Sequence, residues 1–250
     1  MRIFRILYFK ELRSYFLSPF GWLVIAFAGL VQAFILTGTI KQFADEAQGE
    51  SLVFMVFNSP FFWFYFLILF PVLTMRLFSE ESRSGTLEGL LTAPLRSWQV
   101  VLSKFSAAYT TFMTLWVPAL IHFYLFTSLT DVPPPFTWAE VAGAMTGVAM
   151  MGLLFTAFGC LASALTSSQI IAAIVCTAIL IVHFLLGLIP SQYSSQLDVA
   201  QFFNFMGSQN HMRDFARGLI DTRPIAYYLS TTFFILLVTY HLFDFRRWKP

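Results

Sequence analysis

Residues 79–97 read SEESRSGTLEGLLTAPLRS and concentrate charged side chains in a chain that otherwise has few. Charged residues make up only 11% of the 250 positions, and phenylalanine-rich runs flank this polar segment on both sides. A short polar segment between long apolar runs is typical of a loop that returns to water between two membrane-crossing helices. The segment therefore marks the chain on either side of it as membrane-embedded.

The composition supports this interpretation over the whole length. Hydrophobic residues make up 58% of the sequence and 31 residues are Phe, whereas soluble domains carry about 45–50% apolar residues. The apolar runs reach about 20 residues, enough to cross a bilayer core, and lipid leaves the backbone no hydrogen-bond partner outside a helix. We predict an all-α polytopic membrane protein with six transmembrane helices: Phe20–Ile40, Phe57–Phe78, Val100–Leu129, Trp138–Leu165, Gln169–Leu188 and Ile225–Phe245.

The distribution of Lys and Arg predicts the orientation of these spans. If residues 79–97 face the cytoplasm, eleven of the 15 Lys and Arg residues lie on the cytoplasmic side and four lie outside. Cytoplasmic segments of membrane proteins carry an excess of these residues. Both termini are therefore predicted to be cytoplasmic, and residues 189–224 are predicted to form an external loop.

Residues 1–16 are predicted to form an amphipathic helix at the membrane surface. At about 100° per residue, one face of the helix carries the basic residues Arg2, Arg5, Lys10 and Arg13. Such a face suits anionic headgroups and water. Glu11 falls on the apolar face, where an unpaired carboxylate is costly. We therefore predict a structural ion pair between Glu11 and a base at the cytoplasmic ends of the spans; the candidates are Arg76, Arg83 and Lys104.

Small residues and prolines predict further local features. Ala139, Gly143 and Gly147 recur at four-residue spacing, which permits close helix packing. Pro71 and Pro118 each remove one backbone hydrogen bond within a span and favour a kink. In the external loop, a short helix is expected from the helical spacing of Met212, Phe215 and Leu219, with Gly218 as its stop and Pro224 in the first turn of the last span.

The sequence lacks the motifs of several kinds of chemistry. It has no GxxxxGK[ST] phosphate loop and no HExxH motif, so it is not expected to bind ATP by that route or to be a zinc protease. No Asp or Glu lies in the middle of a span, whereas ion-coupled transporters usually keep ionisable groups there for the coupling ion. His122 and His183 are the titratable candidates at membrane depth, and hydrogen bonding between helices is the simpler role for each. We expect no metal and no directly bound cofactor.

The polar segment itself predicts a docking element. Gly85 allows a bend, Thr86–Leu91 can form a short helix with Leu87, Leu90 and Leu91 along one side, Pro94 ends it, and Ser97 can cap the next span. An amphipathic helix held in the cytoplasm by two spans is suited to a groove on a soluble partner, with leucines as anchors and Glu80, Glu81 and Glu88 as charge complements. An ordinary solvated loop remains the alternative.

These residues carry a resemblance to a known family. FSEESRSGTLEGLLTAPLRSWQVVLSKF, residues 78–105, resembles the loop by which permeases of the ABC-2 transporter type contact their ATPase subunit. The matched positions in this sequence are Phe78, Glu81, Gly85, Thr86, Glu88, Leu90, Leu91, Pro94 and Lys104. The predicted ATPase-coupling residues also include Glu80, Arg83 and Leu87. The N-terminal KELRSYFLSPFGW resembles the start of such permeases, and HMRDFARGLIDTRPIAYYLS resembles the gliding-motility branch of the family before its last span.

The resemblance implies a single ABC-2-type transmembrane domain over residues 1–250 in the bacterial inner membrane. It implies a non-catalytic permease, an exporter in the first instance, whose energy comes from cytoplasmic ATPase subunits that bind ATP and Mg²⁺. It further implies a second permease copy, identical or related, and leaves room for an accessory membrane or extracytoplasmic protein. No nucleic acid partner is expected. The alternatives are a passive channel or membrane scaffold, and an intramembrane enzyme that uses His122 and His183.

Overall fold

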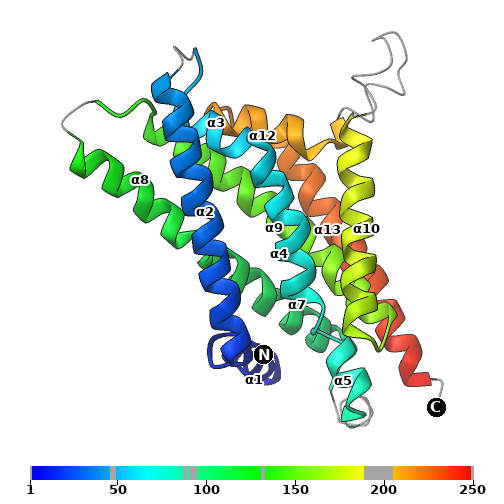
Figure 1. The fold of residues 1–250 in the computed structure, drawn as a ribbon. Coiled ribbons are helices and arrows are strands. Elements are labelled where there is room, and N and C mark those ends of the chain that lie inside the picture. The colour runs from blue at the N-terminus through cyan, green and yellow to red at the C-terminus, as the bar shows by residue number, and fades with distance from the viewer. Residues whose placement is uncertain are drawn as a thin grey trace.

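Long helices run side by side between two ends of the molecule, as the computed structural model in Figure 1 shows. The structure describes residues 2–45, 49–86, 89, 95–130, 133–188 and 205–248, and contains no strand among them. The helices are α1 (Arg2–Phe16), α2 (Pro19–Asp45), α3 (Leu52–Asn58), α4 (Pro60–Thr74), α5 (Ser79–Arg83), α7 (Ser97–Thr114), α8 (Val117–Leu129), α9 (Trp138–Leu165), α10 (Gln169–Leu188), α12 (Ser208–Ala216) and α13 (Thr222–Trp248).

The predicted all-α polytopic membrane fold is confirmed. Within the described part of the chain, five helical stretches are long and apolar enough to cross a membrane, one of them made of α7 and α8 together, and the bent pair α3–α4 can supply a sixth. The helices α9 and α10 have the bounds predicted for the fourth and fifth spans. The start of α1 and α5 lie at one end of the bundle, together with the end of α13, whereas α12 lies at the opposite end (Figure 1).

The second span differs from its predicted bounds, Phe57–Phe78. The chain breaks at Ser59, where α3 and α4 meet at 48°, and α4 ends at Thr74, three residues after Pro71. Ser59 caps the new helix, because its Oγ accepts a hydrogen bond from the backbone N–H of Phe62 at 3.3 Å, and Pro60 occupies the first helical position. A hydroxyl cap followed by proline is a strong start signal for a helix, and here it prevails inside an apolar run.

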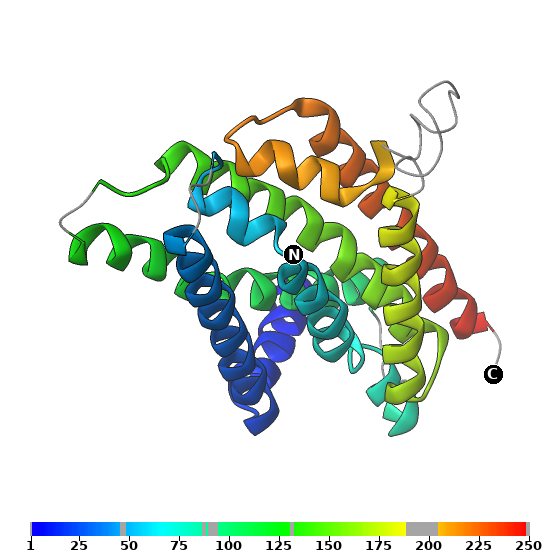
Figure 2. The same cartoon turned by 45° about the horizontal axis from the view of Figure 1, so that its top comes forward.

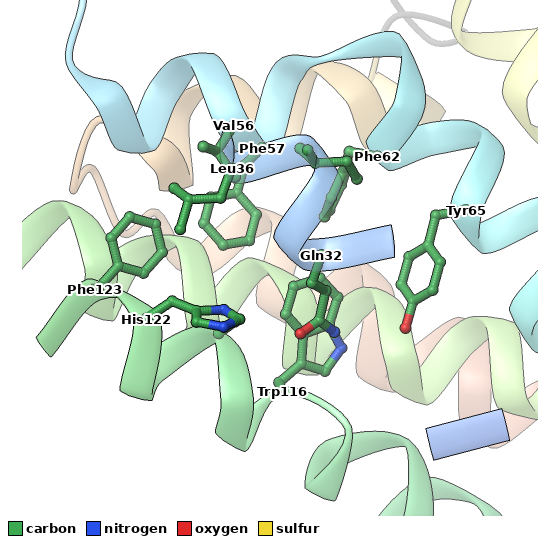
Figure 3. Close-up of a pocket in the computed structure, with 11 residues that line it drawn as sticks. Gln32, Leu36, Val56, Phe57, Phe62, Tyr65, Trp116, His122 and Phe123 are labelled. Carbon is green, nitrogen blue, oxygen red and sulfur yellow. The ribbon is translucent and has the colours of Figure 1, made fainter. Parts of the chain in front are cut away.

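The third span also breaks, at the place where Pro118 predicts a kink. Helix α7 ends at Thr114 and α8 begins at Val117. The amide side chain of Gln32 on α2 compensates for the break, because its Nε2 donates to the carbonyl oxygen of Leu115 at 2.9 Å. Figure 3 shows Gln32 among aromatic side chains from α3, α4 and α8, next to Trp116. The buried polar contact and the surrounding rings hold the two half-helices in register.

Helix α9 is the centre of the bundle. In its most apolar stretch 67% of the residues are buried, against 22% to 28% for the other continuous spans. It contacts α4, α7, α10, α12 and α13, and Figure 2 shows it crossing beneath α12. A helix buried on most sides needs small residues wherever a neighbour approaches closely.

The small residues of α9 seat the short helix α12. A Cβ on Gly143 would overlap the carbonyl oxygen of Phe215, and a Cβ on Gly147 would lie 2.9 Å from the sulfur of Met212. At Ala139, the third residue of the stripe, the backbone lies so close to Gly218, just after α12, that a Cβ on Gly218 would be 3.4 Å from the Ala139 carbonyl group. The stripe therefore packs against the segment before the last span.

That segment forms the predicted short helix with one difference. Met212 and Phe215 are buried as expected, and Gly218 has the positive φ of 78° that ends a helix. Leu219, however, lies beyond α12 and is 61% exposed, because the chain has already turned at Gly218. The helical spacing of Leu219 therefore does not reflect a place on the helix.

Buried polar groups join α12 to the two neighbouring spans. His183 Nε2 on α10 lies 2.7 Å from Ser208 Oγ, to which the Tyr228 hydroxyl of α13 donates at 3.0 Å. The same hydroxyl lies 3.2 Å from Nδ1 of His211. His183 is thus an interhelical hydrogen-bonding residue, while His122 lies on α8 beside α2 and α3. The structure does not bring the two histidines together as an enzyme site would require.

Candidate coupling site

The turn that follows α4 is bound to the central helix by one hydroxyl. Ser163 Oγ on α9 accepts hydrogen bonds from the backbone N–H groups of Phe78 at 3.0 Å and Ser79 at 3.2 Å. It donates to the carbonyl oxygen of Met75 at 3.1 Å. These are backbone groups at the end of one helix and the start of the next, where intrahelical partners run out; the Met75 carbonyl oxygen also accepts a hydrogen bond from the Ser79 hydroxyl. The start of the polar segment is therefore fixed to α9.

A cluster of charges then joins the polar segment to the N-terminal helix. Lys104 Nζ on α7 lies 2.9 Å from Glu11 Oε1 on α1 and 3.0 Å from Glu81 Oε1 on α5. Lys10 lies over the same carboxylates, 3.5 Å from Glu81 and 3.9 Å from Glu11. Two lysines and two carboxylates leave the cluster formally neutral. Three cations were predicted as candidate partners of Glu11, and Lys104 is the one that pairs with it in the structure.

Lys104 is buried, and this determines what it can do. The residue is 3% exposed, and its ammonium also lies 5.6 Å from the ring centre of Phe78, itself 1% exposed. Buried charges persist only when they are paired and hydrogen-bonded. Lys104 and Phe78 were assigned from the sequence to the ATPase contact. In this structure neither side chain faces solvent. Both therefore hold the polar segment against the helix bundle.

Other side chains of the polar segment face outward. Glu80, Arg83 and Thr86 are exposed, although Glu80 Oε2 also lies 4.0 Å from Arg76. Gly85 has a φ of +72°, a left-handed conformation that favours glycine. This residue turns the chain away from α5, as the bend expected from the sequence requires. The outward residues form a mixed-charge tip at the end of the bundle that also holds α1.

Part of the predicted docking helix lies outside the described residues. These positions are Leu87, Glu88, Leu90, Leu91 and Pro94. The helix that the structure does show, α5, begins earlier, at Ser79. The predicted cap of the third span is wrong, because Arg96 holds the N-cap position and Gln99 Oε1 accepts from its N–H at 3.4 Å. Ser97 instead donates to Asp244 Oδ1 on α13 at 2.6 Å.

The family model for the ABC-2 family transporter protein matches residues 8–238. The chain belongs to this family. No curated protein matches the chain significantly. Membership makes it a multi-pass membrane permease of an ABC transporter, that is, a transport subunit that is not itself catalytic. Permeases of this family in general work with cytoplasmic ABC ATPases.

Sequence reasoning missed two residues of this site, Ser163 and Asp244. Ser163 carried no signal, because a serine in a small-residue helix reads as packing. Asp244 stood near the end of the last span without an indicated partner. Among the described residues no group of three or more His, Cys, Asp or Glu side chains is arranged to hold a metal ion.

Proposed function

We propose that this permease is driven by a separate cytoplasmic ATPase that docks on residues 79–97. The ion cluster around Lys104 supports the proposal, because the buried ammonium of Lys104 on α7 pairs with a carboxylate of the polar segment and with one of α1. A segment that passes motion from an ATPase to a permease must be firmly attached to the helix bundle on one side and must expose side chains to the ATPase on the other. Glu80, Arg83 and Thr86 are among the exposed side chains in the described part of this segment, and the leucines at positions 87, 90 and 91 are the proposed anchors.

The remaining features of the proposal follow from the sequence. The Lys and Arg bias supports cytoplasmic termini, and family resemblance supports the bacterial inner membrane, a dimer of permease subunits and an exporter. Assignment to the gliding-motility branch rests on the resemblance of residues 211–230 alone, and the family match does not support it. ATP and Mg²⁺ belong to the proposed partner.

The proposal is tested with the purified complex of permease and ATPase in lipid. Replacing both anchors, Leu90→Ala with Leu91→Ala, removes apolar contacts that each stabilise an interface by about 1–3 kcal/mol. We expect co-purification of the ATPase, or the permease-dependent part of its activity, to fall while membrane insertion persists.

The control is a matched pair of apolar truncations at the opposite end of the molecule. Leu219 and Ile220 are 61% and 54% exposed, so Leu219→Ala with Ile220→Ala removes similar side chains far from the polar segment. This pair should leave the ATPase association unchanged. Full coupling in the Leu90 and Leu91 variant would remove this segment as the docking element and favour a passive channel or scaffold.

A further inference from the structure

A groove of about 540 Å³ opens between α4, α10 and α12. This volume lies within the range of small-molecule sites, about 300–1,000 Å³. The first turns of α4 and the last turns of α10 form its apolar walls, with Trp63, Phe64, Ile181 and Leu185 among the lining side chains. Helix α12 adds two polar residues, Gln209 and Arg213. The groove is therefore apolar along two spans and polar where α12 crosses them.

The apolar side chains that line the groove are exposed on the outer surface of the helix bundle. Phe64 is 63% exposed, Leu185 54% and Ile181 42%. The inner wall is closed, because the rings of Trp63 and Phe184 meet edge to face with centres 5.4 Å apart. In a bilayer these surfaces contact hydrocarbon, so an acyl chain lying along them exchanges one apolar environment for another and gains close packing contacts.

Arg213 gives the groove a charge preference. Among the described residues no carboxylate lies within ion-pair distance of its guanidinium. The other arginine at this end of α12 differs, because Arg217 pairs with Glu50 at 2.7 Å and stacks over Phe54 at 4.6 Å. A guanidinium recognises phosphate through paired N–H donors. A guanidinium at the mouth of a cleft between membrane helices can offer these donors to the phosphate of an anionic lipid headgroup.

We propose that this groove binds one anionic phospholipid of the surrounding membrane. Its acyl chain lies between α4 and α10, and its headgroup phosphate accepts hydrogen bonds from Arg213 and from the amide of Gln209. The site depends on the chain spanning a membrane, which the family shows. It does not depend on the proposed ATPase docking, which involves the opposite end of the molecule.

The test measures lipid contact at Trp63, within the groove. The full chain is placed in nanodiscs of phosphatidylcholine doped with phosphatidylglycerol whose acyl chains carry bromine, a fluorescence quencher. The same measurement uses brominated phosphatidylcholine. The signal from Trp63 is the difference between the wild type and a Trp63→Phe variant. We expect the brominated phosphatidylglycerol to quench Trp63 at a lower lipid fraction.

Arg213→Gln should remove most of this preference, raising the phosphatidylglycerol fraction needed for half-quenching about fivefold, as expected for one lost contact between a basic residue and a lipid headgroup. The matched control is Arg223→Gln, which removes the same charge from an exposed side chain outside the groove. It should keep the preference. Equal melting temperatures of both variants exclude misfolding as the cause.

Three results would overturn the proposal. Equal quenching by both lipids would mean that the groove has no headgroup preference. A preference that survives Arg213→Gln would place the recognition elsewhere. Quenching by neither lipid, together with cross-linking between two copies that carry Leu185→Cys, would show that a second copy covers the groove.

Discussion

Replacing Lys104 with methionine tests whether its ion cluster holds α1 and α5 in place. Lys104→Met keeps most of the side-chain volume but leaves Glu11 and Glu81 with only the exposed Lys10 as a counter-ion. Each Oε1 lies about 3 Å from the same nitrogen, so the two oxygens lie no more than about 6 Å apart. At an effective dielectric constant of about 20, two charges at that distance repel by about 3 kcal/mol. This agrees with the cost of about 3–5 kcal/mol for removing one partner of a buried pair.

Lys10→Met is the matched control on the same cluster. The Lys10 side chain is 62% exposed, whereas that of Lys104 is 4% exposed. Exposed ion pairs contribute about 0–1 kcal/mol, so Lys10→Met should cost little. The free energy of unfolding is measured by titration of the micelle-embedded protein with SDS, followed by tryptophan fluorescence.

A neutral triple variant completes the experiment. Adding Glu11→Gln and Glu81→Gln to Lys104→Met removes the two partly buried carboxylates and leaves only the charge of Lys10, whose side chain is 62% exposed; replacing the buried members of an ion cluster together is often nearly neutral. We expect most of the lost stability to return. The reasoning would be refuted if Lys104→Met destabilised the protein no more than Lys10→Met, or if the triple variant were less stable than Lys104→Met alone.

Three further predictions concern the opposite end and the topology. Gly143→Ala should cost about 1–3 kcal/mol through overpacking against α12, whereas Gly38→Ala, with open space around its Cβ, should not destabilise; SDS titration separates them. Burial lowers the pKa of His211 to about 4, whereas the unfolded side chain titrates near 6.5. Stability should therefore be constant above about pH 7 and fall from about pH 6.5 toward pH 4, and His211→Asn should flatten this fall in melting temperature. Because both native cysteines are buried, an impermeant maleimide should label Gln209→Cys in intact cells and spare Thr86→Cys; the reverse pattern would invert the topology.

The spans bounded by clear polar signals were predictable. Trp138–Leu165 follows Thr137, whose side chain and that of Glu140 form reciprocal caps with the backbone, so hydropathy and capping agree there. The break at Ser59 was missed because length and hydropathy alone treat an apolar run as continuous. The cap and proline that cause the break were nevertheless present in the sequence.

The coupling site was predictable as a segment but not as a set of contacts. The basic helix with Glu11 on its apolar face predicted a cation partner, and the packing of α1 against α7 places Lys104 at 2.9 Å from that carboxylate. The three hydrogen bonds of Ser163 connect residues more than 80 positions apart. Such a pairing depends on how two helices are placed in space, which no local pattern in one sequence specifies.

Helix α9 is one long helix that contacts other segments near both of its ends. Its 28 residues make it about 42 Å long, and it contains no proline that would kink it. Ser163, near the C-terminal end of α9, accepts hydrogen bonds from the backbone of Phe78 and Ser79, and Gly143, near its N-terminal end, packs against Phe215 of α12. Figure 1 shows α5 and α12 at opposite ends of the bundle. Because α9 is one continuous helix, we expect a displacement of the charged tip to move α9 as a unit and, with it, α12. Helix α9 thus connects the two ends of the molecule.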